Sequence, residues 1–260
     1  MSNVKAIFST FKLQLTQSFG RPTFKFCVLA QPILYAFVLY MMYRNSGESY
    51  YVNHIVLGSG LCSLWSAICF SSAGDIQREA YMGTLENISS VPVPFYLIIF
   101  GKILANTLLG LLGMGISLIS IFLFSGKGMI IEDVGVFIIG FIGMLITFVA
   151  ISIVIAPIFT LSKEARILMN CMEYPIFILC GLVVPVKVLP LGIRVISYLL
   201  PQTWGTILVR GSADGTLVGG DFIKVLLLCI GISVFYIGIS IFLFKEIDKN
   251  TRIDATWGVS

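Results

Sequence analysis

Charged residues are scarce in this sequence. Only 12% of its 260 residues are Asp, Glu, Lys or Arg, whereas an ordinary soluble domain carries about 25%. Hydrophobic residues make up 57% of the chain, and its mean hydropathy is +0.98. So few charges cannot solvate a protein of this size, and we expect the lipid bilayer to be its solvent. Apolar runs recur to the C-terminus, which argues against a secretory signal followed by a soluble body.

Several chemical signatures are also absent. The single histidine, His54, cannot build a His-rich metal site, and the six cysteines include no Cys-x-x-Cys pair, so we expect small buried hydrophobes rather than zinc ligands or disulfides. The sequence has neither Gly-x-x-x-x-Gly-Lys-Ser/Thr nor Gly-x-Ser-x-Gly, which predicts that the chain itself neither hydrolyses ATP nor acts as a serine hydrolase. The sequence has no basic stripe interleaved with aromatic residues, so nothing in it indicates a nucleic-acid partner.

Six apolar runs account for most of the chain. About 20 residues of helix, rising ~1.5 Å each, cross a hydrocarbon core of ~30 Å. The runs lie at 26–43, 55–74, 95–124, 134–161, 171–186 and 222–244. The fifth is short and contains Pro175 and Pro185, so we expect a helix that crosses most of the membrane and then breaks. The predicted fold class is therefore an all-α integral membrane protein, a single domain over 1–260 with six transmembrane helices.

The placement of basic residues indicates the orientation. With the N-terminus inside, eleven of the 17 Lys and Arg residues fall on the cytoplasmic side of these runs. Basic residues accumulate on the cytoplasmic side of membrane proteins. We therefore expect a multi-pass protein of the cytoplasmic (plasma) membrane with both termini in the cytoplasm.

Two segments outside the runs have their own patterns. In residues 1–21, apolar side chains such as Val4 and Phe8 share one arc at 100° per residue and Lys5 and Lys12 lie elsewhere, which predicts an amphipathic helix in the inner membrane interface. Packing on another protein surface is the alternative. Residues 187–221 are too apolar for a free loop and too rich in proline for another crossing, so we expect short re-entrant helices in the outer leaflet.

A polar loop at 75–94 separates the second and third runs. Its charges must lie in water or against a partner, because a charge at the bilayer centre costs about 2.5–3.5 kcal/mol. Gly83 is suited to end the descending helix, and Thr84 to cap a short helix over 85–90 with Leu85 and Ile88 on one side. Such a helix, held between two membrane helices, transmits force if a partner grips it. A solvated connector is the alternative.

Two ordered sets of residues lead to a family. The first comprises Arg78, Glu79, Gly83, Thr84, Leu85, Glu86, Pro92, Gly101 and Lys102. The second comprises Pro185, Pro190, Arg194, Ser197, Pro201 and Arg210. Together they resemble the ABC-2 family of ABC-transporter permease subunits, and the likeness extends over nearly the whole chain. The stretch 87–90 departs from it, since family members often carry more apolar residues there.

The resemblance implies a coupling function for the polar loop. Residues Gly83 to Ile88 would form a coupling helix seated in a separate ATP-binding subunit, with Glu79 at the contact between that subunit and the N-terminal helix. The ATPase-coupling residues implied are Glu79, Gly83, Thr84, Leu85, Glu86 and Ile88. It also implies two ATPases that hold Mg-ATP, a second permease copy or a related permease, and a path lined largely by the second and fifth helices. The outer re-entrant segment would include Pro190, Arg194, Ser197 and Pro201.

A few polar residues and glycines lie within the runs. Glu173, beside Tyr174, is a candidate proton site or gate, or else an interfacial anchor, and Ser66 either faces a path or bonds within its helix. Gly110 and Gly115 are expected to permit close helix packing.

Taken together, these features predict the permease subunit of an ATP-driven exporter. Few intramembrane charges indicate an apolar or amphiphilic cargo, such as an antibiotic, a peptide, a lipid or a lipid-linked glycan. The alternatives are a secondary transporter driven by an ion gradient and a membrane immunity protein without transport. No metal or cofactor is expected on this chain.

Overall fold

The computed structural model describes residues 3–44, 51–81, 83, 93–161 and 165–254. Every regular element in these ranges is a helix, which confirms the all-α class. Five helices in the described residues are long and apolar enough to cross a membrane. These are α2 (Pro22–Tyr43), α3 (Tyr51–Tyr81), α5 (Phe95–Ser125), α6 (Val134–Leu161) and α10 (Gly220–Asp254).

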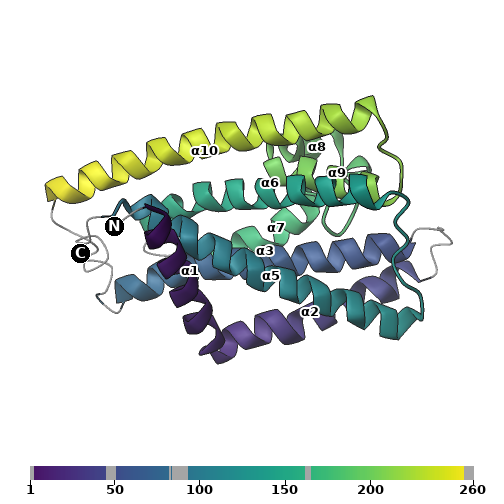
Figure 1. Cartoon of the computed structure of the whole chain (residues 1–260), viewed down its shortest axis with the longest axis horizontal. Coiled ribbons are helices and arrows are strands. Elements are labelled where there is room, and N and C mark those ends of the chain that lie inside the picture. The colour runs from purple at the N-terminus through teal and green to yellow at the C-terminus, as the bar shows by residue number, and fades with distance from the viewer. Residues whose placement is uncertain (1–2, 45–50, 82, 84–92, 162–164, 255–260) are drawn as a thin grey trace.

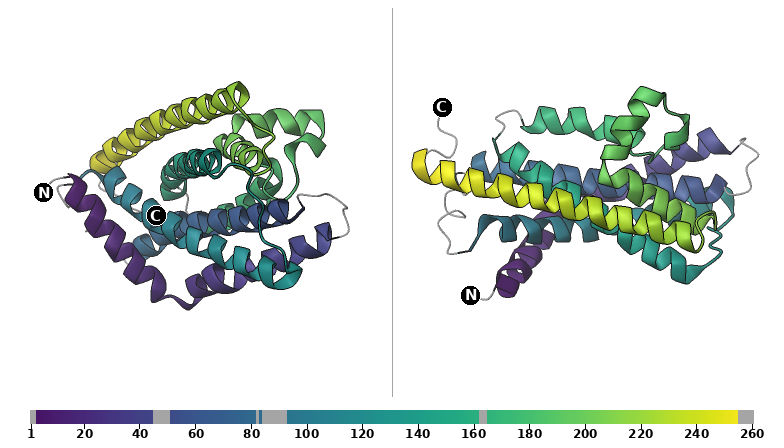
Figure 2. Two further views of the ribbon diagram at one scale, coloured as in Figure 1. Left: turned by 45° about the vertical axis from the view of Figure 1, so that its right-hand side comes forward. Right: turned by 90° about the horizontal axis from the view of Figure 1, so that it is seen from above.

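The five long helices run roughly along the long axis of the molecule, and α1 (Asn3–Phe19) crosses them at a steep angle (Figure 1). We call the end where α2 stops and α3 starts the α2–α3 end, and the opposite one the α3–α5 end. The start of α1 and the last turns of α10 both lie at the α3–α5 end (Figure 1; Figure 2). A bundle of this kind satisfies its backbone hydrogen bonds within each helix, as a hydrocarbon environment requires.

Helix α3 is the centre of the bundle. Nearly all residues of its segment Tyr51–Cys69 are buried, whereas few of those in Gly220–Phe244 of α10 are. It contacts α2, α5, α6, α7 (Ala165–Leu179) and α9 (Pro201–Ala213). The buried rings of Trp65 in α3 and Phe148 in α6 meet edge to face at 6.4 Å. The outer faces of α2 and α10 remain apolar and exposed, as they would against lipid.

One glycine of α5 permits a close contact with α3. A Cβ at Gly110 would lie 2.7 Å from Leu64 Cδ1 and 3.0 Å from Leu64 Cα, so the two backbones approach where only glycine fits. Gly115, on another side of α5, has no described heavy atom within 4 Å of such a Cβ. Close packing is therefore confirmed for Gly110, and the same expectation for Gly115 is wrong for the contacts within this chain.

Helix α7 differs from the run expected over 171–186. It begins at Ala165 and ends at Leu179, because the chain turns at Gly181, where φ is +72°. The Leu182 amide donates to the Phe177 carbonyl at 3.0 Å and the Gly181 amide to the Ile178 carbonyl at 3.2 Å, which is a Schellman ending. The helix stops before Pro185, which was expected to break it. A sixth crossing at this position stays a prediction.

Short helices follow α7, as expected for 187–221. They are η1 (Val186–Val188), α8 (Leu191–Leu199) and α9. The Leu199 carbonyl at the end of α8 accepts a hydrogen bond from Tyr236, well inside α10, at 3.1 Å. Helix α9 then returns along α6 to the α2–α3 end, where Asp214 meets the first turn of α3. The placement of this segment in the outer leaflet stays a prediction.

Helix α1 presents different chemistry on different sides. Gln14 and Ser18 are buried against the bundle, whereas Val4 and Phe8 are exposed and apolar, and Lys12 is exposed as well. A protein-facing polar stripe beside an exposed apolar arc fits a helix that lies against both the bundle and a membrane surface. The position of α1 in the inner interface stays a prediction.

Candidate functional site

The predicted coupling segment begins where α3 ends. Arg78 and Glu79 belong to the last turns of α3, which runs to Tyr81, and their side chains lie outside the described part of the chain. Gly83 is exposed with φ at +67°, a backbone conformation that glycine adopts without strain. The remaining predicted coupling residues lie outside the described residues: Thr84, Leu85, Glu86 and Ile88. The coupling function of this segment therefore stays a prediction.

Helix α1 is fixed to α5 near the α3–α5 end. A Cβ at Gly101 would lie 2.8 Å from the Ile7 carbonyl oxygen, so the two helices cross closely at this position. One turn further along α5, Asn106 accepts a hydrogen bond from the Gln14 side chain at 3.2 Å. Because α5 starts at Phe95, directly after the 75–94 segment, this junction holds α1 beside the first turns of α5.

Ser66 and Glu173 lie together between α3 and α7. The Ser66 hydroxyl donates to Glu173 Oε1 at 2.5 Å, and both side chains are buried. Tyr174, the third residue predicted to line a path or gate, is 62% exposed, and its ring meets that of Phe177 edge to face at 5.9 Å. The structure therefore brings two of the three predicted residues together in one site. Their function in transport stays a prediction.

Two residues of α2 complete a polar cluster around this pair. Gln31 Nε2 donates to the Tyr35 hydroxyl at 2.5 Å, and the Tyr35 hydroxyl lies 3.4 Å from Ser66 Oγ. The hydrogen bonds described within the cluster come from uncharged groups. A buried carboxyl among neutral donors is suited to hold a proton or to contact a polar group of a cargo, since an unpaired buried charge is costly. Neither Gln31 nor Tyr35 was expected from the sequence, because nothing in α2 marks its facing side.

The predicted residues of the outer segment hold that segment together. Arg194 donates to the carbonyl of Lys187 and, at 3.0 Å, to that of Leu189, which ties η1 to α8. Ser197 is fully buried, and its carbonyl accepts a hydrogen bond from Thr203 at 2.5 Å. Pro190 precedes α8 and Pro201 is the first residue of α9, where a proline loses no helical hydrogen bond.

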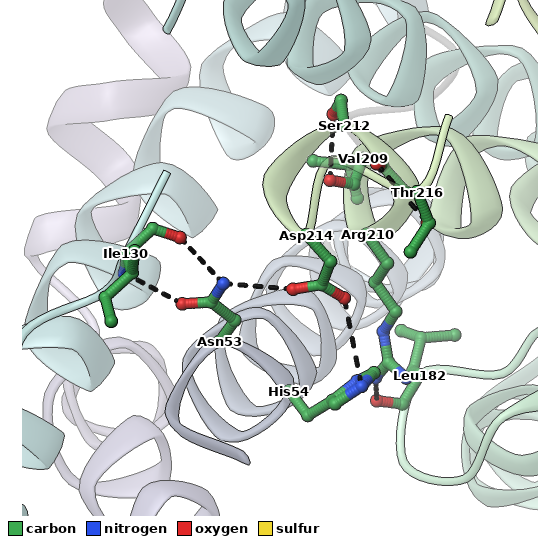
Figure 3. A network of polar contacts seen from close by, with 10 residues as sticks. Asn53, His54, Ile130, Leu182, Val209, Arg210, Ser212, Asp214 and Thr216 are labelled. Carbon is green, nitrogen blue, oxygen red and sulfur yellow. Dashed lines mark hydrogen bonds and ion pairs between the residues drawn. The ribbon is translucent and has the colours of Figure 1, made fainter. Parts of the chain in front are cut away.

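A polar network that the sequence did not reveal joins several elements at the α2–α3 end (Figure 3). Asn53 donates to the Ile130 carbonyl at 2.8 Å and accepts from the Ile130 amide at 3.0 Å. Its amide nitrogen also lies 3.0 Å from Asp214 Oδ1, and Asp214 Oδ2 lies 3.8 Å from His54 Nε2. Asn53 thus contacts both the α5–α6 connection and the end of α9, and His54 contacts the end of α9.

Arg210 extends this network to the turn after α7. The side chain is only 8% exposed, and its Nη2 donates to the Leu182 carbonyl at 2.7 Å. The Tyr43 hydroxyl at the end of α2 donates to the next carbonyl, that of Val183, at 3.0 Å. Arg210 was expected only as a residue following the outer segment. The structure shows that it holds this turn.

The comparison with known families decides the identity. The model described as "ABC-2 family transporter protein" matches residues 40–242. The chain belongs to the ABC-2 transporter family. A comparison with curated proteins finds no match. The predicted family is confirmed, and the match runs from the end of α2 into α10.

Family membership and the apolar helices together define the protein's class. An ABC-2 protein with several helices of membrane length is a multi-pass membrane protein and a transport permease. As the membrane subunit of its family it is not itself catalytic, and ABC-2 permeases normally work with ABC ATPase partners.

Proposed function

We propose that this chain is the permease subunit of an ATP-driven exporter that moves an apolar or amphiphilic cargo across the cytoplasmic membrane. The family match over 40–242 supports this proposal above all. Two ATPase subunits carry Mg-ATP and grip residues 75–94, and a second copy or a related permease completes the path. The cargo class follows from the scarcity of charge in the spans and includes antibiotics, peptides, lipids and lipid-linked glycans.

The mechanism is alternating access driven by nucleotide. ATP closes the two ATPases, the coupling segments move, and the paired permeases reopen outward. The bias between the two states comes from the differential affinity of nucleotide for them. The direct connections of the 75–94 segment with α3 and α5, and the α1–α5 junction beside Gly101, support this transmission.

Co-purification with the ATPase tests the proposal. We expect Glu86→Arg and Leu85→Asp each to lower the amount of ATPase retained on the purified permease by about tenfold or more, since central interface residues contribute about 2 kcal/mol or more. Asp221→Arg and Val218→Asp are matched controls at exposed positions near the opposite end of the bundle. If the complex survives both changes at 85 and 86, the coupling assignment is wrong.

Transport driven by an ion gradient is a second candidate, and one observation favours it. Glu173 is a buried carboxyl in a polar cluster of the bundle core, which is where a proton-coupled carrier needs an ionisable group. Transport by the purified permease with its ATPase removed, driven by a proton gradient alone, would establish this candidate and reject the ATP-driven one.

A further inference from the structure

The network at the α2–α3 end joins parts of the chain that are far apart in sequence. Asn53 bonds to Ile130 across 77 positions and to Asp214 across 161 positions. Asn53 is 1% exposed, so its amide is withdrawn from water and bonds to the protein instead. A buried amide with these partners stabilises one arrangement of the elements and penalises any arrangement that separates them.

The turn after α7 lies next to this network, on the side toward the core of the bundle. A Cβ at Gly58 would lie 2.9 Å from the Leu182 carbonyl oxygen and 3.4 Å from an Arg210 nitrogen, so α3, α9 and the turn after α7 meet at one point. Position 215 is also crowded: φ is +65° at Gly215, and an added Cβ would collide with the Glu132 carboxylate. The α5–α6 connection, α9 and the turn after α7 therefore close over the start of α3.

Below this closure, one side of α3 carries small or polar residues spaced four apart: His54, Gly58, Cys62 and Ser66. His54 faces Asp214 and Ser66 faces Glu173. Cys62 is 1% exposed and belongs to the same buried cluster as Leu182 and Val209. This side of α3 thus leads from the network at the α2–α3 end to the polar cluster at Glu173, along the contact with α7 and α9.

From this arrangement we propose that Asn53 and Asp214 form a latch that closes one end of the transport path. The latch consists of the hydrogen bonds of Asn53 to Ile130 and Asp214, together with the contact between Asp214 and His54. Opening the latch separates α9 and the α5–α6 connection from α3 and admits water along the side of α3 that carries Cys62. The proposal rests on the transport function proposed above, because it assigns a gate to that path.

Two natural cysteines report directly on the latch. Cys62 lies on α3 between Asn53 and Glu173's partner Ser66, whereas Cys229, equally buried, lies on α10 in a separate cluster with Leu208 and Phe222. In the full chain with the other four cysteines changed to alanine, reconstituted in nanodiscs, the labelling rates of both thiols by a charged thiosulfonate are measured. A thermal unfolding scan confirms that this background is folded.

We expect Asn53→Ala to raise the labelling rate of Cys62 by about tenfold or more, because labelling of a buried thiol follows the population of the open form. Asp214→Ala, which leaves the Asn53–Ile130 bonds in place, has a smaller effect in the same direction. Ser59→Ala is the control, since the hydrogen bonds described for its hydroxyl go to the Ile55 and Val56 carbonyls of its own helix. Labelling of Cys229 stays constant in all three variants.

Two outcomes overturn the latch. If Cys62 labelling is unchanged in both latch variants, the network does not close a path. If Cys229 labelling rises in parallel, the substitutions loosen the whole bundle, and the network is only structural. Adding the ATPase with a non-hydrolysable ATP analogue then separates this proposal from the previous one: if the latch variants expose Cys62 but nucleotide does not alter its exposure in the parent, the gate stands and the ATP-driven mechanism fails.

Discussion

The side-chain amide of Gln14 in α1 donates a hydrogen bond to the side-chain oxygen of Asn106 in α5, at 3.2 Å. Both residues are buried. They lie 92 positions apart in the sequence, so the bond joins two separate parts of the chain. An amphipathic helix that only rested on a membrane surface would have no need of a buried polar contact with the bundle. Helix α1 is therefore part of the packed structure and not a detachable anchor.

This contact predicts energetic coupling between α1 and α5. In a double-mutant cycle, Gln14→Ala and Asn106→Ala should couple by about 1 kcal/mol, because each single change already breaks the bond. Thermal unfolding of the detergent-solubilised permease measures the cycle. Gln17→Ala, at an exposed position of the same helix, is the control and has little effect. Strictly additive losses from the two substitutions would contradict the contact.

The two glycines of α5 predict opposite results for one substitution. Gly110→Ala should lower the free energy of unfolding by about 1–3 kcal/mol, because the new methyl group meets the backbone and side chain of Leu64. Gly115→Ala adds a methyl group in open space and should stabilise the helix by about 0.5–1 kcal/mol. Unfolding midpoints of both variants provide the comparison. A loss of equal size at both positions would show that close packing is not what Gly110 provides.

Gly181 and Gly126 distinguish two effects of replacing a glycine that has positive φ, namely backbone strain and collision of the added Cβ with a neighbour. Both have positive φ, at +72° and +64°, so alanine is strained at either position. Only at Gly181 would a Cβ also meet a neighbour, Val186 Cγ2 at 2.7 Å. We expect Gly126→Ala to cost about 1 kcal/mol and Gly181→Ala to destabilise clearly more, as measured by thermal unfolding. Equal effects would mean that the turn after α7 adapts to the added methyl group.

Glu173 decides between the two energy sources considered for transport. Glu173→Gln keeps an acceptor for the Ser66 hydroxyl but removes the ability to ionise. In an ATP-driven exporter, cargo flux in proteoliposomes containing the ATPase should remain strictly dependent on ATP, with a loss smaller than about tenfold, of the size of one hydrogen bond. Ser66→Ala is the companion variant and should show a loss of similar size. Complete loss of flux in Glu173→Gln alone, with dependence of the parent on a proton gradient, would favour the ion-driven alternative.

The sequence predicted the helical class and the family well, because both depend on local signals. Apolar runs locate the long helices directly, and the spacing around Gly83 and Arg194 carries the family resemblance. The end of α7 was placed too late, at Pro185. A proline is visible in the sequence, whereas the left-handed turn at Gly181 depends on the side chains that pack around it.

The contacts that build the two polar sites could not be predicted in the same way. Ser66 and Glu173 are 107 positions apart, and nothing in the sequence pairs this carboxyl with a particular serine of α3. Asn53 carries no motif at all, because its function depends on a backbone segment near Ile130. Likewise, Gly110 and Gly115 look alike in the sequence, and only the rotation of α5 against α3 distinguishes them.

The enclosure of α3 has a mechanical consequence. The helix continues without a break from Tyr51 to Tyr81, and nearly all of its first nineteen residues are buried by other parts of the chain. About 40 Å of rigid rod, at ~1.5 Å per residue, separates Asn53 from Tyr81. Along Tyr51–Cys69, a push or twist carried by the helix would act on the neighbouring helices rather than on fluid hydrocarbon. It would be felt at the start of α3, where Asn53 is bonded to Ile130 and Asp214.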